Sequence, residues 1–254
     1  MPDQQLFDLA SQQLLHDEQQ LRAEVTRMLT DSKAEALTTN FARQWLGMYM
    51  LLDHAVDEEQ FPEYDADLRD SMLRQTEALF SRVLTSGAPV KELLTADDGV
   101  ADQDLQVVYG STATPGGDAS PRAGIGLLGH GSVLTLTSYP TRTSIVRRGL
   151  WVLENLLCEH PPAPPADLDT ELDGPLEGTL RQRMAAHRAD PSCAVCHDLI
   201  DPVGFALENY DAVGCWRELE EGQPVVALGE PFPLHETPLG QNLVRVEEPV
   251  GGHE

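Results

Sequence analysis

The sequence predicts a mainly α-helical protein with a helical N-terminal domain over residues 1–110, a second domain over 111–217 and an irregular C-terminal segment over 218–254. Apolar residues recur at helical spacing through the first hundred positions. A stretch rich in Gly, Ser, Thr, Pro and Asp then interrupts the pattern between 97 and 122, as a surface loop does. After residue 217 the chain has little periodicity and is rich in Pro, Gly and Glu.

Three sets of apolar residues in the N-terminal domain are spaced three, four or seven apart, so each set should lie on one face of a helix and point to a core. These sets are Leu21, Val25 and Met28; Leu37, Phe41, Trp45 and Met48; and Leu68, Met72 and Leu79. A turn is expected at 61–65, between two of the helices.

Two helices are expected in the second domain before the residues that carry its chemistry. One runs over about 145–158 and ends at the proline-rich run 161–165. The other begins at Thr179, which can form a capping box with Gln182. Asp190 and the proline after it should end that helix.

The chain is strongly acidic, with 42 Asp and Glu against 17 Lys and Arg and a formal net charge of -25. Such a charge repels nucleic acid and anionic membrane surfaces and favours a basic protein partner. No apolar stretch approaches the roughly 20 residues that a transmembrane helix needs. We therefore expect no nucleic-acid partner and no transmembrane segment.

The strongest chemical signal is the sequence Cys-Ala-Val-Cys-His, formed by Cys193, Cys196 and His197 with the two residues between the cysteines. Thiols about one helical turn apart can add to the two vinyl groups of one porphyrin, and the adjacent imidazole can bind its iron. The motif predicts one covalent haem c, with both cysteines as attachment sites and His197 as the proximal ligand.

Other readings of the motif remain open. A structural zinc site needs four ligands, of which the motif supplies three, and Cys158, Cys215 or another histidine could complete the set. A thioredoxin-like redox pair needs a strand-to-helix context, which the preceding helix does not provide. Whether Cys158 and Cys215 form a disulfide is also open.

The distal ligand is not fixed by the sequence, because no Met follows the motif. An open sixth position on the iron is one alternative. The upstream candidates for a distal ligand are Met184, His187, His130 and Tyr139.

Residues in the segment after the motif could also contact the haem. We expect Asp201 and the following proline to turn the chain sharply, and Phe205 to pack against the porphyrin. Arg217 could pair with a haem propionate, because a guanidinium matches a carboxylate in a bidentate fashion.

Several separated motifs resemble a planctomycete-type cytochrome family with paired domains of unknown function. They are HRADPSCAVCH at 187–197, IDPVGFALENYD at 200–211, TSYPTRTS at 137–144, the helix and proline run that follow it, FARQWL at 41–46, and 61–62 and 93–97. They occur in the family's order and cover about 5–217. The resemblance implies an exported haem protein, usually much longer, with the two cysteines and His197 in their haem roles. Tyr139 stands where the family commonly has His.

These observations predict an extracytoplasmic monohaem c-type cytochrome, periplasmic or extracellular, that exchanges electrons with a redox partner protein. Haem is attached after export, yet the first residues lack a basic and apolar signal. We therefore expect this chain to be a processed form or a fragment of a longer precursor. The alternatives are a peroxidase- or oxidase-like haem enzyme with an open or weakly ligated distal position, and an interaction module with structural haem or zinc.

Overall fold

A computed structural model describes residues 2–97, 102–110, 125–162, 178–220 and 222–225. It is mainly helical, which confirms the predicted fold class. Contacts divide the chain into two units. Unit 1 comprises the described residues of Met1–His54 and Glu63–Leu136, and unit 2 comprises Ala55–Pro62 with the described residues from Thr137 onward.

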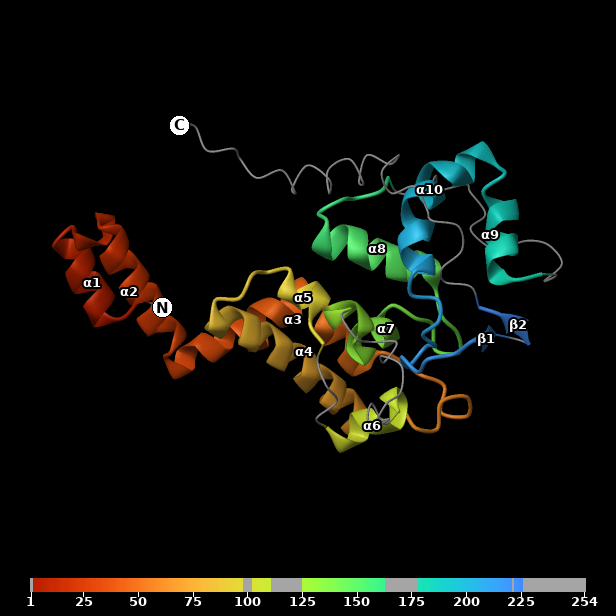
Figure 1. The fold of residues 1–254 in the computed structure, drawn as a ribbon, viewed down its shortest axis with the longest axis horizontal. Helices are drawn as coiled ribbons and strands as arrows, with labels where there is room; N and C mark the ends of the chain where they lie inside the picture. Colours follow the sequence, from red (N-terminus) through yellow and green to blue (C-terminus); the bar gives the residue numbers. More distant parts are fainter. Residues whose placement is uncertain (1, 98–101, 111–124, 163–177, 221, 226–254) are drawn as a thin grey trace. The chain divides into compact units, whose positions relative to one another are not determined.

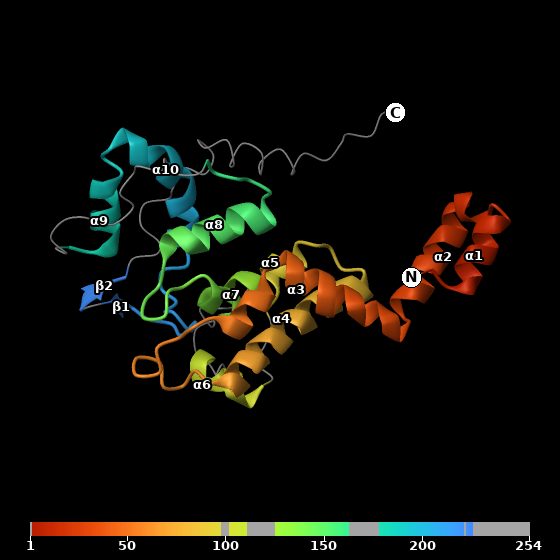
Figure 2. The ribbon, with the colours of Figure 1, turned by 180° about the vertical axis from the view of Figure 1, so that it is seen from behind.

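Unit 1 consists of α-helices joined by shorter 3-10 and π segments (Figures 1 and 2). Its described elements are α1 (Gln4–Ser11), η1 (Leu14–His16), α2 (Glu18–Leu29), η2 (Ser32–Ala34), η3 (Leu37–Ala42), α3 (Arg43–Trp45), η4 (Met48–Asp53), α4 (Ala66–Ser86), α5 (Glu92–Thr95), α6 (Gln103–Tyr109), η5 (Gly126–Gly129) and α7 (Gly131–Leu136). Helix α6 lies inside the stretch that the sequence predicted as a loop.

The long helix α4 forms the centre of unit 1. Its first turn is capped by the Asp65 carboxylate, which accepts a hydrogen bond from the Leu68 amide, and Gly87 ends it in the left-handed conformation. The apolar side chains predicted to face a core do so here: Leu68, Met72 and Leu79 are buried. Elements η4 and α7 pack on the same helix.

One other predicted core face is wrong, and another holds only in part. In α2, Leu21 and Val25 are exposed and the buried side chain is Glu24, which pairs with Arg27. In the set from Leu37 to Met48, Met48 is buried and Trp45 is half-buried. Leu37 and Phe41, which lie in the π-helical segment η3, are exposed.

Unit 2 is built around three helices, α8 (Ile145–Leu156), α9 (Leu180–His187) and α10 (Pro191–Phe205). The expected helix over about 145–158 is therefore present, beginning at a Ser144 cap. The predicted capping box between Thr179 and Gln182 is confirmed at the start of α9. A short antiparallel pair follows, β1 (Leu219–Glu220) and β2 (Gln223–Pro224), in which Leu219 faces Pro224.

Helices α8 and α10 pack closely because each places a glycine against the main chain of the other. A Cβ atom at Gly149 of α8 would overlap the carbonyl oxygen of Ile200, and one at Gly204 of α10 would overlap that of Ile145. The buried side chains of Leu153 and Ile200 pack together beside these contacts. This pairing fixes the helix that carries the cysteine motif (Figure 2).

Most of the proline-rich run at 161–165, much of the loop predicted at 97–122 and most of the C-terminal segment, 226–254, lie outside the described residues. Within the described part, no helix is both long enough and apolar enough to cross a membrane.

Candidate functional site

The cysteine motif lies in the first half of α10. Asp190 caps this helix through a hydrogen bond from the Ser192 amide, and Pro191 occupies the first turn, where its missing N–H costs nothing. Asp190 and Pro191 thus begin the motif helix as well as following α9. Positions 193, 196 and 197 are three and four apart, so Cys193, Cys196 and His197 share one face of α10.

The two motif thiols have different surroundings. Cys193 is buried. Cys196 is half-buried against the cluster of Leu153 and Ile200, and its Sγ lies 3.6 Å from the carbonyl oxygen of Pro162. No disulfide joins any of the four cysteines, all of which lie among the described residues. Both motif sulfurs are therefore present as separate thiols.

The motif histidine is held by a buried carboxylate one turn further along α10. His197 Nδ1 lies 2.8 Å from Oδ1 of Asp201, and the Asp201 side chain is wholly buried. An ionised carboxylate can only accept a hydrogen bond, so Nδ1 is the nitrogen that donates in this contact, and in the neutral imidazole Nε2 then has the lone pair. This is the arrangement of a metal-ligating imidazole, whose second nitrogen donates to a carboxylate or carbonyl oxygen.

An arginine approaches the other oxygen of this carboxylate. Arg188 Nε lies 3.7 Å from Oδ2 of Asp201, and its Nη1 lies 3.6 Å from Oδ1 of the exposed Asp198. Within the described part of the chain, Oδ2 of Asp201 accepts no hydrogen bond. The buried charge is therefore shared between a short contact to His197 and a longer one to Arg188.

The chain does not turn at Asp201 and Pro202, contrary to the expectation from the sequence. Helix α10 continues through Pro202 to Phe205. Proline at this position removes one N–H from the helical ladder. The close packing of α8 on α10 outweighs that loss, and the continued helix is what brings the Asp201 carboxylate back to His197.

Three of the predicted site residues lie near the motif. Met184 and Phe205 form a buried cluster with Ile145, and Phe205 is covered by the Arg181 guanidinium 4.1 Å from its ring centroid. The His187 ring meets His197 edge to face at 4.9 Å between centroids. No porphyrin fits between two rings at that distance, so His187 lies beside His197 and not across a haem from it.

The remaining ligand candidates are held by other partners. Tyr139 lies between two guanidinium groups, those of Arg142 and Arg147, 4.4 and 3.9 Å from its ring centroid. His130 is buried in unit 1, where its Nδ1 lies 3.0 Å from the Thr76 hydroxyl. Tyr139 is thus held by two guanidinium groups, and His130 contacts a hydroxyl of its own unit.

Arg217, the predicted propionate partner, has protein partners in the structure. Its guanidinium pairs with Glu220 at 2.8 Å and donates to the Thr143 hydroxyl at 2.9 Å. Nearby, Glu208 is buried, and this burial raises the pKa of its carboxyl group, with the negative charge of Glu220 adding to the effect.

A second arginine, Arg148, secures the segment that follows α10. It is wholly buried, and its Nη1 and Nη2 donate to the carbonyl oxygens of Leu207, Tyr210 and Asp211 at 2.6–2.7 Å. Desolvation lowers the pKa of Arg148 to about 9, so it still carries its charge at neutral pH. The segment after the motif helix is thereby fixed to α8.

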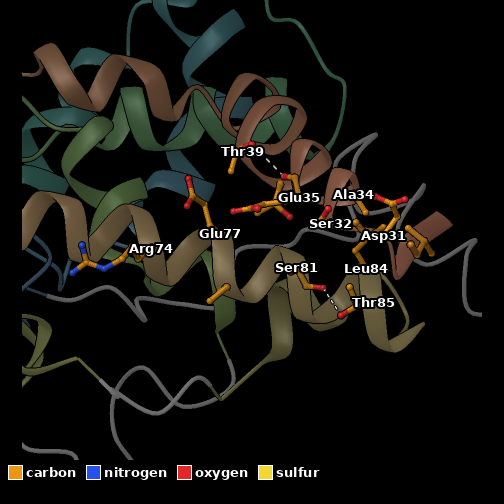
Figure 3. A pocket seen from close by; sticks show the side chains of 13 residues that line it. Asp31, Ser32, Ala34, Glu35, Thr39, Arg74, Glu77, Ser81, Leu84 and Thr85 are labelled. Atoms are coloured by element: carbon orange, nitrogen blue, oxygen red, sulfur yellow. Dashed lines mark hydrogen bonds between the residues drawn. The ribbon is translucent and has the colours of Figure 1, made fainter. Parts of the chain in front are cut away.

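Unit 1 contains a cavity of about 390 Å³ between η2, η3 and α4. Figure 3 shows Glu35 and Glu77 directed into this space, with hydroxyl side chains around them. Glu77 pairs with Arg43. The lining is mixed, because Leu29, Ala34 and Leu84 lie beside the polar side chains, and sequence reasoning gave no sign of the cavity.

Sequence reasoning also missed Asp201 as the partner of His197. The signal was available, because a carboxylate four residues after a ligating histidine on a helix lies on the same face. No group of three or more Cys, His, Asp and Glu side chains that could hold a metal ion occurs among the described residues. The motif residues do fit a covalent haem, which takes two thiols and one imidazole from the chain.

Two family models match consecutive parts of the chain. Residues 1–111 match PSD4, a protein of unknown function (DUF1592), and residues 124–220 match PSCyt3, a protein of unknown function (DUF1588). The resemblance to paired domains of unknown function is thus confirmed. No curated protein and no solved structure matches the chain.

Proposed function

We propose that the chain is a monohaem c-type cytochrome that works outside the cytoplasm in electron transfer. The observation that carries the proposal is the shared face of Cys193, Cys196 and His197 on α10, with Nδ1 of His197 held by the buried Asp201. A cysteine pair with only a structural role does not require a histidine oriented in this way, whereas a haem iron requires one as its ligand.

Each residue has a defined part in this proposal. Cys193 and Cys196 would form the two thioethers, which fix the porphyrin against α10. His197 would present Nε2 to the iron, and Asp201 keeps the proton on Nδ1. When bound, the haem supplies one-electron chemistry between ferric and ferrous iron. The electron would come from, and pass to, a redox partner protein.

Two properties of the chain support electron transfer. The formal charge of -25 would attract and orient a basic partner at low ionic strength. The helix that carries the motif is tightly packed on α8, so its geometry should change little between oxidation states. A structural zinc ion would need about four donor side chains, and the described residues do not gather them around the motif.

A peroxidase- or oxidase-like haem enzyme is the second candidate. Its support is that Met184, His130 and Tyr139 are each engaged elsewhere, which favours an open sixth position on the iron. The two candidates differ in iron ligation. An electron carrier should have six-coordinate, low-spin iron, whereas an enzyme of this kind should have high-spin iron or an easily displaced sixth ligand.

The test is expression of the full chain with an export signal in a host that attaches haem c. The matured protein should show a c-type reduced-minus-oxidised spectrum, low-spin ferric iron and fast electron exchange with a small basic cytochrome, which slows as salt is added. Peroxide turnover with high-spin iron would instead support the enzyme. A protein that binds partners identically in both oxidation states would point to a structural role.

A further inference from the structure

The His197–Asp201 pair carries an inference about the chemical character of the site. We propose that Asp201 is a positioning residue that orients the His197 imidazole and makes it a stronger electron donor, and that Arg188 limits this effect. The inference rests on the proposed haem attachment and deepens it, because it sets the oxidation state that the site favours.

The first support is geometric. His197 and Asp201 are one turn apart on α10, and their contact of 2.8 Å is that of a well-formed hydrogen bond. The edge contact from His187 at 4.9 Å restricts the imidazole from a second direction. Two contacts therefore fix the ring plane, and with it the direction of the Nε2 lone pair.

The second support is burial. The Asp201 side chain has no solvent exposure, whereas Asp198 on the same helix is 69% exposed. A carboxylate away from water interacts more strongly with its hydrogen-bond partner, since solvent does not screen the charge. The negative charge of Asp201 therefore acts mainly on the His197 N–H and on Arg188.

The positive charge of Arg188 opposes the effect of Asp201 on His197. At 3.7 Å its Nε forms a longer contact with Asp201 than His197 does, and only 24% of its side chain is exposed. The guanidinium stabilises the buried carboxylate, which would otherwise be costly to keep ionised. It also weakens the effect of the Asp201 negative charge on the His197 imidazole.

A carboxylate partner makes a ligating imidazole more basic than a backbone carbonyl would. Such a ligand stabilises ferric iron more than ferrous iron. The reduction potential of the site should accordingly be lowered by Asp201, and removal of the Arg188 charge should lower it further.

The experiment compares three variants of the matured protein with the wild type. Asp201→Asn keeps the shape and an accepting oxygen but removes the charge. We expect at least a tenfold shift of the one-electron equilibrium toward ferrous iron, about 59 mV upward, and a lower iron–histidine stretching frequency. Arg188→Gln should shift the potential downward. Glu154→Gln is the control, because it removes an exposed carboxylate of the neighbouring helix α8 and should change the potential little.

A normally loaded Asp201→Asn protein with the wild-type potential would overturn the inference. A shift of equal size in Glu154→Gln would also overturn it. Should Asp201→Asn not fold, nitrogen NMR of the unloaded wild-type chain decides. The inference requires His197 with its proton on Nδ1, and a proton on Nε2 overturns it. Failure of the proposed function is a separate result, since it would appear as wild-type protein without covalent haem.

Discussion

Gly149 of α8 lies directly against the main-chain carbonyl of Ile200 on α10, with no room for a Cβ atom between them. The contact is three residues beyond the motif histidine. A second contact of the same kind joins Gly204 of α10 to the main chain of Ile145 on α8. Helix α10, which carries the cysteine motif, is therefore positioned by close backbone packing. The geometry of the candidate site thus depends on residues that touch none of its functional groups.

Gly149→Ala should therefore destabilise unit 2. The added methyl group must push the two helices apart, and overpacking of this kind costs about 1–3 kcal/mol. Urea unfolding of wild type and variant, followed by circular dichroism, measures the loss. Glu154→Ala, at an exposed position of the same helix, is the control and should stay within about 0.5 kcal/mol of wild type. Equal stability of Gly149→Ala and wild type would show that the helices are not in contact here.

Arg148→Lys should also destabilise the protein, although the charge is kept. A lysine ammonium cannot reproduce the guanidinium fork, so some of the carbonyls of Leu207, Tyr210 and Asp211 would be left unpaired. The expected loss is on the order of 3 kcal/mol, from the cost of unsatisfied buried acceptors. Thermal unfolding checks it. The same exchange at the exposed Arg22 should have little effect, and a comparable loss there would contradict the special role of Arg148.

Glu208→Gln should change how stability depends on pH. Burial raises the folded-state pKa of Glu208 above its unfolded value, so the folded state binds the proton more tightly. Its contribution is fully present below the unfolded pKa and is lost as the pH rises through the folded pKa. Glutamine does not titrate, so the variant does not lose this stabilisation. Its free energy of unfolding relative to wild type should therefore increase as the pH rises from the unfolded-state pKa of Glu208 through the folded-state pKa. A constant difference at all pH values would contradict the assigned cause.

Met184→Leu tests whether Met184 serves as a distal ligand. The side chain is buried against Ile145 and Phe205, so a substitution that conserves volume should cost less than about 1.5 kcal/mol. We expect the matured variant to keep the absorption and electron paramagnetic resonance spectra of the wild type. A change from low-spin to high-spin ferric iron would identify Met184 as a ligand and contradict the structural placement.

The sequence predicted best what depends on neighbouring residues. The capping box of Thr179 and Gln182 is local, and the structure contains it at the start of the expected helix. The spacing of the cysteine motif is also local, although the helix α10 that carries it was not predicted. The carbonyl partners of Arg148 are 59 to 63 residues away, so periodicity cannot reveal them. The expected core face of Leu21 and Val25 failed because α2 instead buries Glu24, which accepts a hydrogen bond from Gln5. Periodicity alone does not reveal such a polar contact.

The residues after the motif also show that local sequence does not predict tertiary contacts. Proline at position 202 predicts a helix end, yet α10 continues because Gly204 lets it pack against α8. The hydrogen bond from His197 to Asp201 depends on that continuation. The four-residue spacing of His197 and Asp201 can be read from the sequence, but the continuation of the helix through Pro202 rests on a tertiary contact that the sequence does not display.

Mass analysis of one tryptic peptide tests the haem assignment most directly. Cleavage after Arg188 and Arg217 releases residues 189–217, which contain Cys193, Cys196 and Cys215. From protein matured with haem attachment, and treated with an alkylating reagent, this peptide should carry one haem and one alkyl group, the latter on Cys215. Three alkyl groups without haem, or a disulfide between Cys193 and Cys196, would contradict the assignment.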